Sequence, residues 1–231
     1  MPFAGYETFD DCVSDNQDKD DPEAFCAWLE KEREVNMSKI ERRYIPASLG
    51  IEERADGKAP VLKGLIPYNS QSEDLGGFRE IFRPGSFSDT IRQDDVVGLF
   101  NHEPSLVLGR SSAGTLRFQD GDAGLIYVLE PPDTQVGRDL VTSVKRGDIK
   151  GTSFAFFVMD MTDEVWEKNG DMPIRNILRA KLSDVSPCTF PAYPESQVAL
   201  RSLENWKASQ EPVQRQLRAR RQRLTELTVD S

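Results

Sequence analysis

The chain has 231 residues, 38 % of them hydrophobic, and a formal net charge of −10, which fits one sizeable acidic domain with appendages. No apolar run approaches the roughly 20 residues that a membrane-spanning helix needs, and the acidic start lacks the basic-then-apolar pattern of a secretory signal. The three cysteines form no paired framework, which predicts reduced thiols and a cytoplasmic protein.

The first segment, residues 1–35, is strongly acidic, with 11 acidic and 3 basic side chains. Residues 7–16 fit a short helix, and Pro22 stands where a second helix would begin, since its missing N–H costs nothing there. Cys12 and Cys26 would face each other across this hairpin, where we expect two buried thiols rather than a disulfide or a metal site. The segment is too small for a large core, so we interpret it as an acidic helical docking module.

The body, residues 36–200, has the texture of short strands separated by turns. One clear helix interrupts it at residues 134–145, where apolar side chains recur at helical spacing and Gly147 provides a cap. Residues 88–92 fit another short helix. The pattern predicts a β-rich α+β body with a barrel-like sheet. The expected strands are residues 42–46, 61–66, 78–82, 96–101, 115–119, 125–130, 152–159, 165–168 and 174–185.

The last segment, residues 201–231, carries 7 basic and 4 acidic side chains. Residues 211–227 are compatible with a helix that has few apolar positions, so we expect a solvated basic helical tail. Its arginines could neutralise phosphates. Nucleic-acid binding is nevertheless disfavoured, because the chain as a whole is acidic.

The chain contains a single histidine, His102. This excludes a zinc site of the His-Glu-x-x-His type and leaves Cys–His clusters without ligands. Gly-rich phosphate and dinucleotide loops are also missing, so the sequence predicts neither a metal nor a cofactor. A lone histidine is more often structural than catalytic. His102, however, follows an apolar strand, and strand ends are places where a rigid scaffold presents catalytic side chains.

Ser153 is a small hydroxyl in an otherwise apolar strand, within Gly151-Thr-Ser-Phe-Ala-Phe-Phe-Val. A buried hydroxyl needs a partner, and a neighbouring backbone carbonyl would be enough. A catalytic role requires a base beside the hydroxyl, because serine is a weak nucleophile until a base takes its proton. His102 is the imidazole that the chain offers for that task.

Asp184 is a carboxylate on the apolar face of a predicted strand, where alternation groups it with Ala180 and Leu182. An unpaired carboxylate there is costly, so it needs a partner. An imidazole N–H would serve, and so would a plain salt bridge to Arg175 or Arg179. Other carboxylates compete with Asp184 for His102, but none has an apolar-face burial argument as strong, and Glu103, as the neighbour of His102 on an extended chain, should point to the opposite face. The competing carboxylates are Glu80, Glu103, Asp133 and Asp139.

The three candidates follow the order His102, Ser153, Asp184. The α/β-hydrolase order of Ser, Asp and His is excluded because no histidine follows Ser153. The chymotrypsin order of His, Asp and Ser has an aspartate available, but the Gly-rich surroundings of its serine are missing. Triads are defined by geometry rather than by order, so a third arrangement is allowed.

Several motifs together give residues 42–200 a resemblance to a known family, the prohead (capsid maturation) proteases of tailed phages. The motifs occur in the order of the family and cover about two thirds of the chain. They are Glu80-Ile-Phe-Arg-Pro-Gly-Ser-Phe87, Phe100-Asn-His-Glu103, Leu108-Gly-Arg110, Gly124-Leu125, Gly151-Thr-Ser-Phe-Ala-Phe156, Leu182-Ser-Asp-Val-Ser-Pro187 and Pro191-Ala-Tyr-Pro194.

The resemblance implies a fold similar to that of the herpesvirus maturation protease, a closed or nearly closed β-barrel with peripheral helices. It also implies Ser153 as nucleophile, His102 as general base and Asp184 as the orienting carboxylate, at a position where many relatives carry Glu.

The expected function is a serine endopeptidase, without cofactor, that cleaves scaffold or scaffold segments of the major capsid protein, and itself. The resemblance places it in the host cytoplasm inside assembling proheads, and we expect a homo-oligomer without membrane contact. The alternative is a non-enzymatic assembly or scaffold module with a protease-like fold.

Overall fold

The computed structural model describes residues 9–17, 21–27, 40–54, 59–170, 172–190 and 199–208. The chain divides into two compact units, Met1–Ile40 and Glu41–Ser231. The predicted tail helix at residues 211–227 and the Pro191–Pro194 motif lie outside the described residues. No helix in the described ranges is long and apolar enough to cross a membrane.

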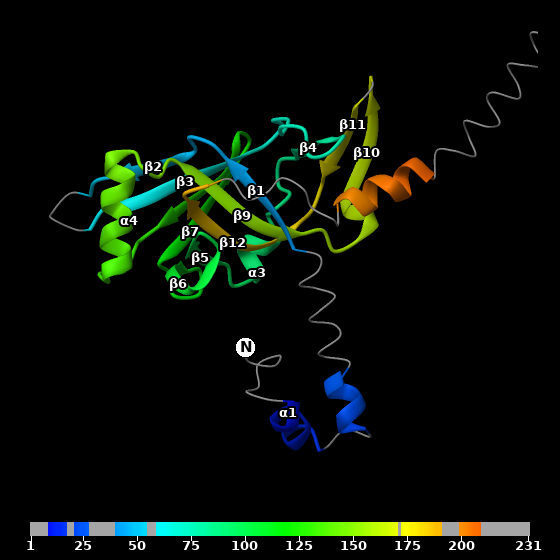
Figure 1. The fold of residues 1–231 in the computed structure, drawn as a ribbon, viewed down its shortest axis with the longest axis horizontal. Helices are drawn as coiled ribbons and strands as arrows, with labels where there is room; N and C mark the ends of the chain where they lie inside the picture. Colours follow the sequence, from blue (N-terminus) through cyan, green and yellow to red (C-terminus); the bar gives the residue numbers. More distant parts are fainter. Residues whose placement is uncertain are drawn as a thin grey trace, which may run out of the picture. The chain divides into compact units, whose positions relative to one another are not determined.

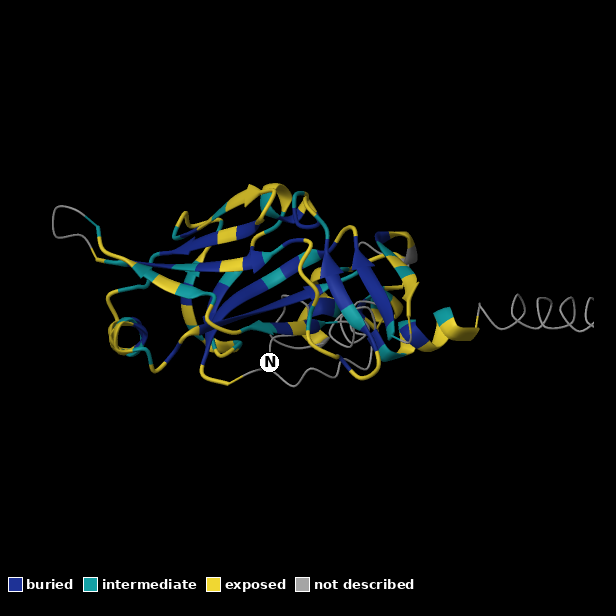
Figure 2. Ribbon diagram, turned by 90° about the horizontal axis from the view of Figure 1, so that it is seen from above, coloured by how far each residue is buried: buried dark blue, intermediate teal, exposed yellow. Residues whose placement is uncertain are grey.

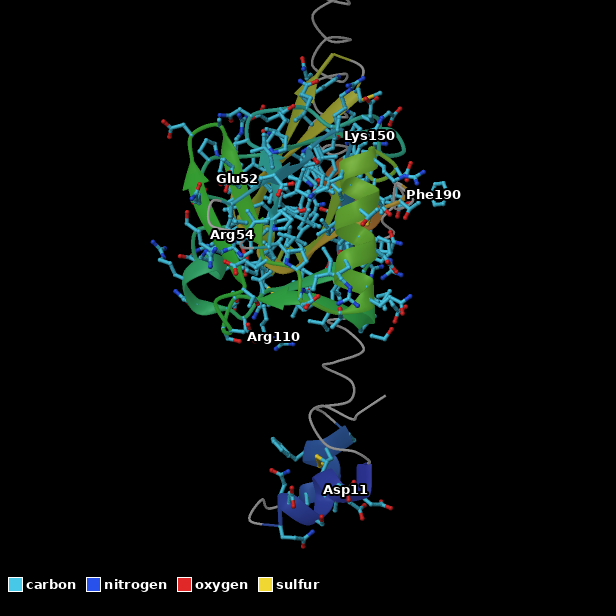
Figure 3. The ribbon with its side chains drawn as sticks, turned by 90° about the vertical axis from the view of Figure 1, so that its left-hand side faces the viewer. Asp11, Glu52, Arg54, Arg110, Lys150 and Phe190 are labelled. Carbon is cyan, nitrogen blue, oxygen red and sulfur yellow. A yellow bond between two sulfur atoms is a disulfide. The ribbon has the colours of Figure 1, made fainter. Side chains whose placement is uncertain are left out.

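The N-terminal unit contains helix α1 (Phe9–Asp15) and a second helical segment at residues 22–27. A disulfide joins Cys12 of the first helix to Cys26 of the second, and Figure 3 shows this bond in yellow. The prediction of two reduced thiols was therefore wrong. Both cysteines are fully buried and their Cα atoms lie 6.1 Å apart, within bridging range. Because Cys12 and Cys26 form a disulfide, they no longer support the inference of a cytoplasmic protein, which assumed free thiols.

The described strands of the second unit pair into three sheets (Figure 1). The five-stranded sheet has the order β1 (Glu41–Ile45), β9 (Gly151–Phe157), β12 (Lys181–Cys188), β5 (Val97–Phe100), β6 (Glu103–Arg110). The four-stranded sheet has the order β2 (Leu49–Glu52), β3 (Val61–Pro67), β8 (Gly124–Leu129), β7 (Leu116–Gly121). The three-stranded sheet has the order β10 (Glu164–Asn169), β11 (Met172–Ile177), β4 (Arg79–Phe82).

The prediction of a β-rich body with few helices is confirmed, whereas the strand pairing among the described residues does not close into a barrel. The segment 174–185, expected as one strand, is two strands, because the chain leaves β11 after Ile177 and enters β12 at Lys181. Strands β2 and β6 were not predicted. β6 is largely exposed, so it lacks the apolar alternation on which a sequence-based assignment relies.

The main core lies between the inner faces of the five-stranded and four-stranded sheets, where the strands in Figure 2 are dark blue. Helix α4 (Gln135–Arg146) adds Leu140 and Val144 to it and packs beside β2 (Figure 1). The helix begins at Thr134, whose side chain accepts a hydrogen bond from the Gly137 N–H, and ends at Gly147 with φ of 80°. Both ends agree with the predicted helix. The second expected helix is α3 (Thr90–Gln93), a single turn.

A smaller apolar cluster joins the helical residues 199–208 to the three-stranded sheet. Leu203 is buried in this cluster, and Trp206 stacks on Trp166 of β10 with ring centroids 6.0 Å apart. The predicted boundary between body and tail, at residue 200, falls inside this helix. Its first turns are packed against the body rather than solvated.

A buried ionic network ties β1 to the three-stranded sheet. Arg43 of β1 binds both Glu41 and Glu80, each at 2.7 Å. Arg175 of β11 binds Glu41 at 2.8 Å, Glu80 at 2.9 Å and Glu164 at 2.5 Å. Burial lowers the pKa of Arg175, but the three carboxylates more than offset this, so the net shift is upward and the guanidinium stays charged. The sequence argument for burial was weaker for Glu80 than for Asp184, yet Glu80 is 1 % exposed because the network buries it.

Breaking this network is expected to destabilise the fold strongly. Arg175→Met leaves Glu41 and Glu80 buried with less compensation, and removing one partner of a buried ion pair costs about 3–5 kcal/mol. Arg117→Met is the control, because Arg117 pairs with Glu130 on the surface, where such pairs contribute at most about 1 kcal/mol. Urea unfolding of both variants measures the difference, and equal losses would contradict a special role of the buried network.

Candidate active site

Ser153 lies on strand β9, which pairs with β1 on one side and β12 on the other in the five-stranded sheet. Strand alternation sends Phe154 and Phe156 into the main core, so Ser153 points to the opposite face. Both faces of the strand are buried, which explains why a single hydroxyl stands in an apolar run. Gly151 shares the face of Ser153, and a Cβ there would come within 2.0 Å of the Tyr44 Oη of the neighbouring strand β1. The glycine of the Gly-x-Ser motif thus makes room for the Tyr44 ring beside Ser153.

His102 lies in a two-residue turn between β5 and β6. Asn101 and His102 both have left-handed backbones, with φ of 53° and 57°, as in a type I′ hairpin turn. Left-handed conformations cost non-glycine residues of order 1–3 kcal/mol and persist where surrounding contacts hold them. Here β12 and the residue after it hold the turn. The Asn101 N–H donates to the Pro187 carbonyl at 3.1 Å, and Asn101 Oδ1 accepts from the Thr189 N–H at 2.9 Å.

Asp184 lies on β12, between the strand of Ser153 and the strand that leads to His102. The register of β12 against β9 shifts between Leu182 and Asp184, and Asp184 then stands opposite Ala155. Its side chain is 10 % exposed. The predicted burial of this carboxylate is therefore observed, although an irregularity of the strand, not plain alternation from Ala180, sets its direction.

The three side chains form a hydrogen-bonded chain. His102 Nε2 is 2.6 Å from Ser153 Oγ, and His102 Nδ1 is 2.6 Å from Asp184 Oδ1. A carboxylate can only accept, so the proton of the neutral imidazole belongs on Nδ1. Nε2 is then the acceptor for the Ser153 O–H. This is the arrangement in which an imidazole can take a proton from a serine hydroxyl while a carboxylate fixes its tautomer.

The site is closed. Ser153 has no exposed surface and the His102 side chain is 9 % exposed. The low exposure removes water that would otherwise compete for the hydrogen bonds of the three residues.

Cys188 is a buried free thiol on the same strand face as Asp184, opposite Gly151. Burial, and then the charge of Asp184, raise the pKa of this thiol to about 11, although a hydrogen bond with Ser153 opposes the shift. The thiol stays protonated at neutral pH, and a thiolate is the nucleophilic form of cysteine. Cys188 is therefore no rival to Ser153.

The other carboxylates considered for His102 are exposed or bound to different partners. Glu103 is exposed and accepts from Ser105, Glu80 belongs to the buried ionic network, and Asp133 pairs with Arg138. Asp139 lies exposed on helix α4. The alternative partners of Asp184 are also engaged elsewhere, since Arg175 binds glutamates and Arg179 binds Asp163. Within the described residues, no group of three or more His, Cys, Asp or Glu side chains is placed to hold a metal ion.

Sequence reasoning missed the residues that hold the turn, namely Asn101, Thr189 and Ser186. Their contacts join segments more than 80 residues apart, so no local pattern reports them. The left-handed backbone at His102 also has no signal, because the usual Asn-Gly pattern is here Asn-His.

A model of one protein family, the caudovirus prohead serine protease, matches residues 49–209 of the 231. The chain belongs to this family. The protease is therefore an enzyme, a serine endopeptidase that acts in prohead maturation. Strand β1 lies before the matched region, whereas Ser153, His102 and Asp184 lie within it. The family excludes the alternative of a non-enzymatic assembly module.

Among solved structures, the protease is similar to the capsid assembly protease of bacteriophage T4. The similarity covers 66 % of this chain and 98 % of that one, at 12 % sequence identity and a TM-score of 0.40. A comparison with curated protein sequences gives no match.

Proposed function

We propose that Ser153 is the nucleophile of the protease, His102 its general base and Asp184 the carboxylate that orients the imidazole. The observation that carries this proposal is the pair of 2.6 Å contacts that His102 makes with Ser153 and Asp184. A nucleophile, a base within hydrogen-bond reach and a third group that orients the base are the parts that acyl transfer requires.

The proposed reaction is acyl transfer in two halves. Nε2 of His102 takes the proton of Ser153 as its Oγ attacks the peptide carbonyl, and the imidazolium then gives this proton to the leaving amine. Water, deprotonated by His102, hydrolyses the resulting acyl-enzyme and frees Ser153. Asp184 stays ionised throughout and stabilises the imidazolium through the Nδ1–H bond.

The substrates that we propose are the major capsid protein and scaffold segments, together with the protease itself. Family membership supports this assignment. We place the reaction inside assembling proheads in the host cytoplasm and propose that the enzyme is a homo-oligomer.

Co-expression with the capsid protein of the same phage tests the function. Wild-type protease is expected to shorten the capsid or scaffold protein, and Ser153→Ala is expected to leave it at full length, because the nucleophile is missing. Gel electrophoresis and intact-protein mass spectrometry measure the size shift. A size shift that persists with Ser153→Ala would contradict the assignment of Ser153.

The N-terminal segment, residues 1–35, is proposed as a docking module that plays no part in catalysis, and the basic tail from about residue 201 as a detachable arm. Support for the first comes from its separate compact unit and its net charge of −8. Support for the second comes from the excess of basic over acidic side chains in residues 201–231, and its first turns, residues 199–208, pack on the body.

Deleting residues 1–35 is expected to leave peptide cleavage unchanged and to reduce incorporation of the protease into proheads. The buried glutamate Glu41 and the strand that carries it remain in this truncated chain. Peptide kinetics and the protease content of purified proheads are the two measurements. Loss of peptide cleavage would show that the segment belongs to the catalytic fold.

A further inference from the structure

Ser186 is a second buried serine in the candidate active site. It lies on β12 directly opposite Ser153 of β9, and it has no exposed surface. It is two residues from Asp184 on the same strand, so both side chains project from the same face of the sheet. The His102 ring meets this face, because His102 bonds to Ser153 on one side and Asp184 on the other.

The hydroxyl of Ser186 contacts the Asp184 carboxylate and the His102 backbone, the two groups that set the position of the imidazole. Its Oγ donates to Asp184 Oδ1 at 2.9 Å and accepts from the backbone N–H of His102 at 3.2 Å. The same oxygen lies 3.4 Å from His102 Nδ1. A hydroxyl has one proton, and the carboxylate can only accept, so the proton of Ser186 belongs to Asp184 and a lone pair to His102.

We propose that Ser186 is a positioning residue of the protease, which fixes the Asp184 carboxylate and the left-handed turn of His102 with one hydroxyl. This proposal rests on the assigned roles of Ser153, His102 and Asp184. The Ser186 hydroxyl bonds to Asp184 and to the His102 backbone, so it acts through these groups rather than on the substrate.

The physical effect follows from the two bonds. The strained backbone of His102 needs contacts that hold it, and the Ser186 Oγ holds its N–H directly. Asp184 Oδ1 accepts from both Nδ1 and Ser186, so the carboxylate cannot rotate without breaking two bonds. Without the hydroxyl, the imidazole loses alignment with Ser153 Oγ, and small misplacements of catalytic groups slow chemistry strongly.

Kinetics of Ser186→Ala on a peptide substrate give the first test. We expect kcat to fall by about 10- to 100-fold, the scale of one lost hydrogen bond to a charged group, with KM unchanged. Ser86→Ala is the matched control, because Ser86 is 1 % exposed and lies in the turn before α3, away from the site. We expect wild-type kcat from this control.

Proton NMR of His102 gives a second measurement. A variant that only weakens the fold would not change the His102 signals, whereas loss of a positioning contact would. The chain has one histidine, so the downfield Nδ1 proton and the ring C–H signals belong to His102 without further assignment. Ser186→Ala is expected to shift or broaden the Nδ1 proton signal and to alter the pH titration of the ring. Ser86→Ala is expected to change neither.

A matched pair of variants keeps the test decisive if Ser186→Ala folds poorly. Thr and Val have the same shape, and only Thr retains a hydroxyl. We expect Ser186→Thr to recover most of the activity and the Nδ1 signal, and Ser186→Val to recover neither. Equal activity of the two variants, or a Ser186→Ala enzyme with wild-type kcat, would overturn the proposal.

The same experiments separate this proposal from the assigned roles. If Ser153→Ala still cleaves, the roles assigned above fail whatever Ser186 does. If Ser153→Ala is inactive while Ser186→Ala keeps wild-type kcat, the roles stand and only the positioning proposal is wrong.

Discussion

Ser153→Ala, His102→Ala and the double variant are expected to lose the same factor in kcat, about 10⁶, because members of a triad act as a unit. The 2.6 Å contact between Nε2 and Oγ makes each residue ineffective without the other. The residual rate above water would come from binding and from oxyanion stabilisation. Single-turnover kinetics on a peptide substrate measure all three variants, with thermal unfolding as the check that each is folded.

Acid is also expected to inactivate the wild-type enzyme, because it removes the function of His102 as a base. Protonation of Nε2 removes the acceptor for the Ser153 proton, so kcat/KM is expected to fall as the pH is lowered. The pH profile can be compared directly with the NMR titration of His102, since the chain has no second histidine. Two results would contradict a coupled pair. One is a double variant whose loss in kcat equals the product of the two single losses. The other is a pH profile of kcat/KM that does not follow the NMR titration of His102.

Most strands and the main helix could be predicted because their signals are local. Helix α4 shows helical spacing, an N-terminal Thr134 cap and a left-handed Gly147, all within one segment. Ser153 could be singled out for a similar reason, since a hydroxyl in a strand buried on both faces is conspicuous within seven residues. His102 was found because there is one histidine, which is a fact of composition rather than of pattern.

What could not be predicted depends on contacts between distant segments. The buried network joins Glu41 to Arg175 across 134 positions, and from the sequence each charge looks like a surface residue. The Cys12–Cys26 bond was missed because an odd cysteine count argued against pairing, while the helical pair brings these two together. That the described strands do not close into a barrel likewise depends on sheet geometry, which alternation does not encode.

For Asp184, one property could be predicted from the sequence and another could not. Its burial followed from strand alternation, and its family position agreed. The actual direction of its side chain, however, depends on the register shift between Leu182 and Asp184. The competing Glu103 was set aside because neighbours on an extended chain point to opposite faces. In the structure His102 is not extended but lies in the left-handed turn, and Glu103, the next residue, is exposed and accepts a hydrogen bond from Ser105.

Asp184→Asn is therefore expected to slow the chemical step by up to about 10⁴-fold while leaving the fold near native. An amide can donate to Nδ1 and so stabilise the tautomer that has its proton on Nε2, which cannot accept from Ser153. Asp184→Glu keeps the carboxylate and is expected to retain much more activity. The measurements are kcat on a peptide substrate and the Nδ1 proton signal of His102, which should be lost in the Asn variant.

Glu103→Gln is the matched control, since it makes the same carboxylate-to-amide change one residue from His102. Its side chain is exposed and accepts from Ser105 at 2.9 Å, so near wild-type kcat is expected. A tenfold or smaller loss in Asp184→Asn together with a large loss in Glu103→Gln would transfer the orienting role to Glu103. That result would mean that the hydrogen-bonded chain from Ser153 to Asp184 is not the one that operates during cleavage.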